Sequence, residues 1–244
     1  ITLVESLAKK IRACNGEVWT GALAKQIVVA NGEAKGVIVQ KDEAEVEVGA
    51  SVVISNAGSR KTVEMVGREN FNTAYLKEMN EKLTPAPIVA VFIASDRPLI
   101  EVPGIVIVAG LRRICFSASV TNLCPNLAPP GKHLLVTFAE PESCLKPMDV
   151  RKETEANIQD LRDLIPEFDK YGKVLKVETH DIHDEWPSSQ SWPGRDLPQK
   201  TPIRNLYNVG GSVKPPGMVG LPACAESGRI VAEEVKKHFK PQRK

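Results

Sequence analysis

The residues best suited to chemistry lie near the C-terminus, in a Gly/Pro-rich loop between an apolar run and a helical pattern. The run Leu206–Val209 leads into Gly210 and Gly211, and Pro215-Pro216-Gly217 and Gly220 precede the helix. Glycine has no Cβ, so the backbone can turn sharply and approach a ligand closely. The first N–H groups of a helix lack intrahelical partners and favour an anion or an electron-rich group. The spacing is equally typical of a loop that only turns the chain, because isolated glycine motifs are weak signals.

A second set of candidate ligands is the run from His180 to Asp184, which reads His-Asp-Ile-His-Asp. Imidazole and carboxylate groups at this spacing could hold zinc or iron. The run continues a predicted strand, however, on which residues 180 and 183 point to opposite faces. We therefore interpret it as a polar strand end and predict no metal site.

Two tryptophans, Trp186 and Trp192, lie in the Pro-containing stretch before the glycine loop. Their large flat side chains could line an apolar substrate cavity, or could equally anchor a long loop by packing. Cys224 lies close to the glycine loop, but no second cysteine or histidine neighbours it. A small buried residue is therefore favoured over a redox thiol at position 224.

The composition indicates a globular protein with a substantial core. The chain has 244 residues, of which 42% are hydrophobic and 25% charged, enough for one large or two smaller domains. The net charge of +2 and the scattered basic residues argue against a nucleic-acid partner. Five cysteines without a CxxC pair indicate reduced thiols in a cytoplasmic protein. The sequence contains no membrane-length apolar run and no visible signal peptide, so we expect membrane association to be peripheral if it occurs.

The elements that would position these residues alternate between helices and strands, which predicts an α/β (α+β) fold. Residues 3–11 have helical periodicity, and the first residue is not Met, as in a chain cut from a longer one. Strands are predicted at 17–22, on both sides of an Asn31-Gly32 turn, at 45–48, and at 52–54, where a buried strand rejoins a parallel sheet. The remaining helices are predicted at 61–66, 74–83, within 143–164 and at 223–239, and the remaining strands at 88–94, 105–109, 113–117, 133–138, 174–182 and 206–209.

Two parts of this pattern together resemble a known family. The segment Asn205–Glu233, with its apolar strand, its Pro/Gly loop and Ser227-Gly228 in the helix, is similar to the C-terminal FAD-binding motif of the phytoene desaturase, carotenoid isomerase and amine oxidase superfamily. Residues 3–37 resemble the family's segment that reaches adenine, and 53–57 its return strand. The resemblance implies a partial FAD-binding domain of the glutathione-reductase/amine-oxidase type, residues 1–60 and 200–244, with an inserted β-rich substrate-binding domain, residues 61–199.

Carried over by position, the resemblance assigns three residues to the adenosine half of FAD. Ala24 would offer backbone hydrogen bonds to adenine, and Asn56 and Ala57 would lie beside the adenosine and diphosphate groups.

Five further residues would hold the flavin half. Gly210 and Gly211 would approach the ribityl-diphosphate, and Met218 and Val219, followed by Gly220, would place backbone N–H groups at the pyrimidine edge of the isoalloxazine ring.

Two departures from the family pattern affect this site. Gly211 stands where the family usually has Asp, whose carboxylate makes a charge-assisted hydrogen bond to a ribityl or diphosphate oxygen. No GxGxxG occurs in the chain, so the unit that grips the diphosphate is absent. Either a second chain or a missing N-terminal segment supplies that unit, or flavin binding has been lost.

Complete members of this family transfer a hydride from an apolar or amine substrate to the flavin. The resemblance therefore implies the C-terminal part of an FAD-dependent oxidoreductase, a dehydrogenase, desaturase or isomerase, in which no catalytic residue stands out. The alternative is a non-catalytic binding protein on the same scaffold, similar to a Rab GDP-dissociation inhibitor or to a degenerate partner subunit. The missing Gly-rich unit and Gly211 favour this alternative, whereas the loop 215–220 and Ser227-Gly228 favour a flavoenzyme.

Overall fold

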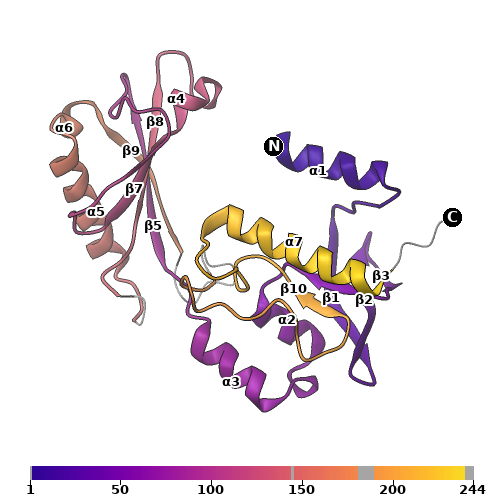
Figure 1. The fold of residues 1–244 in the computed structure, drawn as a ribbon. Helices are drawn as coiled ribbons and strands as arrows, with labels where there is room; N and C mark the ends of the chain where they lie inside the picture. The colour runs from indigo at the N-terminus through magenta and orange to yellow at the C-terminus, as the bar shows by residue number, and fades with distance from the viewer. Residues whose placement is uncertain (1, 144–145, 181–189, 240–244) are drawn as a thin grey trace. The chain divides into compact units, whose positions relative to one another are not determined.

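The computed structural model describes residues 2–143, 146–180 and 190–239, which form two compact units (Figure 1). The first unit comprises residues 1–79 and 197–244, and the second comprises residues 80–196. The mixed arrangement of helices and strands confirms the predicted fold class. Residues 61–79, which the sequence analysis placed in the second domain, belong to the first unit. The reason is that α2 (Ser59–Val66) hydrogen-bonds through its side chains to residues of the C-terminal segment.

An antiparallel meander forms one part of the first unit, with strands β1 (Ala22–Ala30), β2 (Glu33–Lys41) and β3 (Ala44–Gly49) in that order. The predicted hairpin is confirmed. Its turn residues Asn31 and Gly32 both have positive φ, 53° and 69°. Two-residue hairpin turns with this geometry match the twist of the flanking strands, which is why Asn-Gly is favoured there.

A short parallel pair joins the N-terminal and C-terminal parts of the first unit. β4 (Val53–Ser55) pairs with β10 (Leu206–Asn208) in register, with Val53 opposite Leu206. The prediction that this strand joins a parallel sheet is therefore confirmed, but the expected burial on both faces is wrong, because Ile54 is 48% exposed. The helical elements of the first unit, including one that runs into the second, are α1 (Thr2–Ala13), α2, η1 (Arg68–Asn70), α3 (Thr73–Lys82) and α7 (Gly220–His238).

The N-terminal region differs from the sequence prediction. Residues 17–21 are not in a strand, so the strand predicted at 17–22 is wrong over most of its length. A strand is stabilised by hydrogen bonds to a neighbour, and no described strand pairs with this segment. Helix α1 has no buried residue, and its apolar side chains are open, with Leu3 73% and Leu7 57% exposed.

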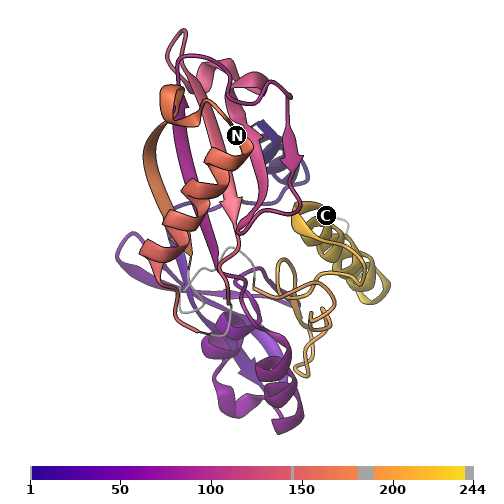
Figure 2. The same cartoon turned by 90° about the vertical axis from the view of Figure 1, so that its left-hand side faces the viewer.

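The second unit is built on an antiparallel five-stranded sheet in the order β6-β7-β8-β5-β9. Its strands are β5 (Ile88–Ser95), β6 (Ile105–Ile107), β7 (Ile114–Ser119), β8 (His133–Ala139) and β9 (Lys173–His180). The helical elements are α4 (Val120–Leu123), η2 (Pro125–Leu127), α5 (Val150–Leu164) and α6 (Phe168–Tyr171). Figure 2 views the unit from the side of α5, which lies along the sheet. The core lies between them and includes Val91, Ile93 and Leu161.

A buried carboxylate fixes α5 to the sheet. Asp160 is fully buried and accepts backbone N–H bonds from Arg112, Arg113 and Ile114, at 3.0, 2.6 and 3.0 Å. Burial by itself raises the pKa of Asp160, but the three N–H donors outweigh burial and hold the pKa below its usual value. The carboxylate therefore stays charged in the folded protein. Among the described residues, no helix is long and apolar enough to span a membrane.

Candidate functional site

Asn56 and Gly210 lie close together, just beyond the carboxyl ends of the parallel strands β4 and β10. The Val209 N–H donates to the Ser55 carbonyl at 2.9 Å, which extends the pairing by one residue. A Cβ at Gly210 would lie 2.2 Å from Asn56 Oδ1, and the φ of Gly210 is +94°. The structure thus gathers Asn56, Ala57, Gly210 and Gly211 at one edge. Ligands of α/β sheets bind at this edge of the strands.

Ser227 connects α7 to this glycine loop. The Gly210 N–H donates to Ser227 Oγ at 2.8 Å, and Ser227 Oγ donates to the Cys224 carbonyl at 2.6 Å. Ser227 is fully buried, so this pair of bonds satisfies a backbone N–H that water does not reach. Ser227 therefore has a structural role, which is to hold the loop against the helix.

A network of buried polar side chains lies next to the glycine loop. Asn208 is fully buried, and its Oδ1 accepts a hydrogen bond from Thr62 Oγ1 at 2.8 Å. Ser212 Oγ accepts from the Ser59 N–H at 3.1 Å and lies 2.9 Å from Ser59 Oγ. Burial raises the pKa of Tyr75, whose hydroxyl lies 3.4 Å from Asn208 Nδ2. These side chains bind one another and hold the strand ends in place.

The end of the loop opens into the first turn of α7. Gly217 and Gly220 have φ of +78° and +66°, and an added Cβ at Gly217 would meet no atom within 4 Å. Val219, the N-cap residue, has extended backbone and an exposed side chain. The Met218 N–H donates to the Pro215 carbonyl at 3.2 Å, so this group closes a turn and is not directed only at a ligand. The open helix end at Val219 and Gly220 fits an electron-rich ring edge.

Ala24 lies apart from the strand ends, on the meander. It is exposed on β1, where the register with β2 shifts between Ala24 and Gln26. Such a bulge leaves one extra residue, here Lys25, outside the regular ladder. Backbone groups near Ala24 are therefore available for an edge contact of the kind that the resemblance implies for adenine.

The remaining candidates lie in the second unit or outside the described residues. Trp192 is half-buried, and its carbonyl accepts the Arg195 N–H at 3.0 Å. Trp186 and the run 181–184 lie outside the described residues. His180 ends β9. In the described ranges, no group of three or more His, Cys, Asp or Glu side chains is arranged to hold a metal ion.

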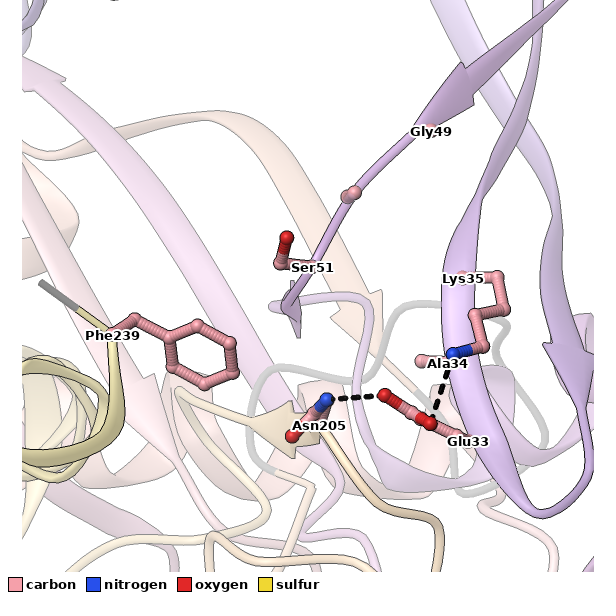
Figure 3. Close-up of a pocket in the computed structure, with 8 residues that line it drawn as sticks. Glu33, Ala34, Lys35, Gly49, Ser51, Asn205 and Phe239 are labelled. Carbon is pink, nitrogen blue, oxygen red and sulfur yellow. Dashed lines mark hydrogen bonds and ion pairs between the residues drawn. The ribbon is translucent and has the colours of Figure 1, made fainter. Parts of the chain in front are cut away.

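A separate cavity of 410 Å³ lies at the other end of the parallel strands (Figure 3). Asn205, which precedes β10, lines it together with Glu33, Lys35, Ser51 and Phe239. The hydrogen bond from Lys35 is the main reason that the pKa of Glu33 is lowered, and Asn205 Nδ2 also donates to Glu33 Oε1 at 2.8 Å. The charged groups of this cavity are thus paired with one another, and the glycine loop is not part of its lining.

Sequence reasoning missed the residues that support the glycine loop. Ser59, Thr62 and Ser212 are ordinary polar residues in sequence, and only the fold brings them together. Lys214 was also missed, although a lysine beside two prolines in a glycine loop is an unusual position. Its side chain is buried, and Nζ donates to the Gly211 carbonyl at 2.6 Å.

Comparison with known proteins agrees with this geometry. A model of the family "flavin containing amine oxidoreductase" matches residues 2–236. An oxidoreductase from Methanosarcina mazei is 31% identical with a TM-score of 0.82, and the match covers 94% of this chain and 53% of that one. The PF1083 protein from Pyrococcus furiosus is 24% identical with a TM-score of 0.68, over 98% and 53% of the two chains.

A curated relative, the uncharacterized protein MJ1488 from Methanocaldococcus jannaschii, is 25% identical over 91% of this chain and 50% of its own length. The chain therefore spans about half the length of these relatives. The family and its FAD-binding fold agree with the predicted superfamily and give no support to the non-catalytic alternative. The chain belongs to the family of flavin-containing amine oxidoreductases.

Proposed function

We propose that this chain supplies the flavin-ring half of the FAD site in an oxidoreductase that transfers a hydride from its substrate to the flavin. One observation carries the proposal. Gly210 is held between Asn56 and Ser227 at the carboxyl ends of two parallel strands, and the open first turn of α7 follows it. Membership of a flavin oxidoreductase family supports the same cofactor.

The residues of the loop fit this group. Gly210 and Gly211 have no side chain, so a ribityl-diphosphate chain can approach their backbone. We place the electron-rich pyrimidine edge of the ring at the first N–H groups of α7, at Val219 and Gly220, because an open helix N-terminus favours such a group. Bound FAD supplies the acceptor of the electron pair. The chain's own task is to orient the ring and to keep water from the reacting atoms.

Of the two predicted substrate classes, apolar molecules and amines, the second unit favours an apolar molecule. Phe116 and Phe138 stack with their ring centroids 4.5 Å apart on neighbouring strands. They lie on the face of the sheet opposite to the core with α5, because the adjacent residues Thr137 and Ala139 point to that core. Phe92 is on the same face, opposite Val136. This aromatic face fits an apolar substrate, and Trp192 is a further candidate for the same contact.

We also propose that a dinucleotide-binding unit from outside residues 1–244 completes the site, on another chain or another part of a longer protein. The chain lacks the GxGxxG that grips a diphosphate. It also has surfaces that such a unit would cover. Ile54, on the parallel strand β4, is 48% exposed between the buried residues Val53 and Ser55, and the apolar side of α1 is open.

Anaerobic reduction tests this function in the natural full-length protein. Candidate substrates of the two classes, an elongated polyene and a primary amine, are added in turn to the FAD-loaded protein. Bleaching of the visible flavin band by the polyene supports hydride transfer from an apolar substrate, and bleaching by the amine selects the other class. If dithionite bleaches the band but no member of either class does, the proposed reaction is wrong.

A further inference from the structure

We propose that one end of the second unit docks on the surface of a phospholipid bilayer. This end, which we call the apolar tip, consists of residues 96–107 and 120–127, that is, the connection after β5, strand β6, and the helical turns α4 and η2. The proposal adds a partner to the proposed function. Binding to a bilayer requires neither bound FAD nor hydride transfer, so the two can fail separately.

The apolar tip carries large hydrophobic side chains that are open to water. Each of them is more than half exposed. The five residues are Val102 (53%), Ile105 (65%), Ile107 (83%), Leu123 (62%) and Leu127 (58%). Single exposed apolar residues are ordinary, but a group of them marks a contact with a membrane or with another protein.

Hydrogen bonds hold the parts of the apolar tip together at one end of the sheet, where α4 lies (Figure 1). Asn122 Nδ2, on α4, donates to the carbonyls of Ile100 and Glu101, at 3.0 and 3.2 Å. Leu123 follows Asn122 and Val102 follows Glu101, so the two apolar side chains flank this contact. The group is therefore one surface built by the fold, although its members come from separate segments.

The same segments carry almost no charge. Residues 114–131 include no Lys, Arg, Asp or Glu, and Glu101 is the one charged residue in 98–111. Contacts between proteins usually have a polar rim around their apolar centre. Insertion among acyl chains instead requires that charge be kept out, because a charged group loses its hydration there. The composition therefore favours a bilayer over a protein partner.

Basic side chains lie beside the apolar tip, at the same end of the sheet. Lys173, the first residue of β9, is opposite Ala94 near the end of β5. It lines a cavity of 320 Å³ together with Lys132 and Tyr171. Lys132 is paired with Asp96, whereas Lys173 has no ion-pair partner within the part of the chain that the structure describes. Ammonium groups and a tyrosine next to an apolar surface match the phosphates and the interface of a bilayer.

One face of the sheet connects the apolar tip to the aromatic residues of the second unit. Residues directly opposite one another on antiparallel strands have their side chains on the same face. Ile107 is opposite Phe116, which is opposite Phe138. Ile105 and Ile107 therefore continue the aromatic face to the edge strand β6. A bilayer at this end would adjoin the face that the proposed function gives to an apolar substrate, and such a substrate dissolves in acyl chains.

The test is co-sedimentation of the natural full-length protein with vesicles of phosphatidylcholine that contain a minority of phosphatidylglycerol. Leu123→Glu and Leu127→Glu, made separately, should each lower the partition coefficient at least about 5-fold, because the carboxylate resists insertion. Val150→Glu is the matched control. Val150 is 46% exposed at the start of α5, beyond the other end of β8, and its replacement should leave the coefficient unchanged. An equal effect in all three variants, or no effect in the first two, would overturn the proposal.

A second measurement uses the wild-type protein and its own cysteines. Cys124 is exposed between Leu123 and Leu127, and Cys14 is exposed on the first unit. Vesicles should slow the alkylation of Cys124 by a membrane-impermeant maleimide at least about 5-fold, because the bilayer blocks access to the thiol, and should leave Cys14 unaffected. Peptide mass spectrometry measures both rates.

The outcomes separate this proposal from the flavin site. A wild-type protein that binds FAD but does not sediment with vesicles, or whose Cys124 reacts equally fast with and without them, contradicts docking on a bilayer. If that protein is instead a dimer that Leu127→Glu dissociates, the apolar tip is an interface between copies of the chain and the proposal is wrong. A protein that sediments with vesicles but stays colourless with FAD would remove the proposed function and leave this inference intact.

Discussion

A side chain at position 210 is unfavourable for two separate reasons. Its φ of +94° is a conformation that L side chains rarely adopt, and a Cβ would approach Asn56 Oδ1 to 2.2 Å. We expect Gly210→Ala to cost about 1–3 kcal/mol of folding free energy, because the positive φ strains the new residue, and to weaken FAD binding, because the Asn56 side chain must move away from the new Cβ.

Gly194→Ala is the control for this prediction. Gly194 also has positive φ, +81°, but an added Cβ there meets no atom within 4 Å. Both variants should lower the melting temperature, and only Gly210→Ala should raise the dissociation constant for FAD. If both variants bind FAD with the same affinity, Gly210 is not part of the FAD site.

Ser227 provides a second test at this scale. Ser227→Ala leaves the buried Gly210 N–H without its acceptor, so we expect a loss of about 1–3 kcal/mol in the free energy of unfolding. Ser6→Ala removes a similar side-chain bond, to the Thr2 carbonyl, on an exposed helix and should cost much less. Chemical denaturation measures both. If both variants lose a similar free energy of unfolding, the buried bond between Ser227 and Gly210 stabilises the protein no more than an exposed one.

Among the elements, α5 depends on the carboxylate of Asp160. Because its pKa in the folded protein lies below the unfolded value, Asp160 stabilises the fold above the unfolded pKa. This contribution is lost as the pH falls through the folded pKa. We expect Asp160→Asn to cost about 3 kcal/mol at neutral pH and to reduce the acid sensitivity of unfolding below about pH 4.

Asp163→Asn is the matched control on the same helix. The Asp163 side chain is 41% exposed, and its partners are the side chains of Arg112 and Gln159, not buried backbone. Its loss should cost less than about 1 kcal/mol. Denaturation curves at several pH values measure the free energy of unfolding of both variants. The prediction is wrong if this free energy depends on pH in the same way in the two variants.

How far the sequence predicted these elements depends on whether the interactions are local. The hairpin at Asn31-Gly32 was found because two residues fix the turn. Helix α7 begins at Gly220, before the predicted start at 223, because Pro222 is tolerated in the first turn, where its missing N–H is not needed. The strand at 17–22 was predicted from residue type alone, but a strand also needs a partner, which the described chain does not provide.

In the candidate site, too, the sequence predicted the local features and missed the contacts between distant segments. The glycines and the loop were recognisable in sequence. The contact between Asn56 and Gly210, the network of Ser59, Thr62 and Ser212, and the burial of Lys214 all depend on pairing between β4 and β10. These strands are far apart in the sequence, and local patterns do not specify which strands pair.

At the scale of the whole molecule, we propose that the exposed apolar side of α1 packs against the dinucleotide-binding unit that would complete the site. Leu3 and Leu7 lie one turn apart on this side, both exposed. In the chain 1–244 alone, we expect the double variant Leu3→Glu, Leu7→Glu to bind less of a hydrophobic dye than the wild type, with an unchanged far-UV circular dichroism spectrum. In the natural full-length protein the same change should lower the FAD content, because the proposed contact of the dinucleotide-binding unit with α1 would be lost.

Lys9→Glu, on the same helix, alters charge without removing apolar surface and is the control. Dye fluorescence and the ratio of flavin to protein absorbance measure the two effects. A double variant that keeps both wild-type values would show that α1 is not part of the interface.

The central claim is that Gly210 and its loop form the flavin-ring half of an FAD site. The most direct measurement is the visible absorbance spectrum of the natural full-length protein, purified in parallel with its Gly210→Val variant and then supplied with FAD. The account predicts the two absorbance bands of protein-bound oxidised flavin in the wild type, and their strong reduction in the variant when equal amounts of folded protein are compared. A wild-type protein that stays colourless with added FAD would contradict it.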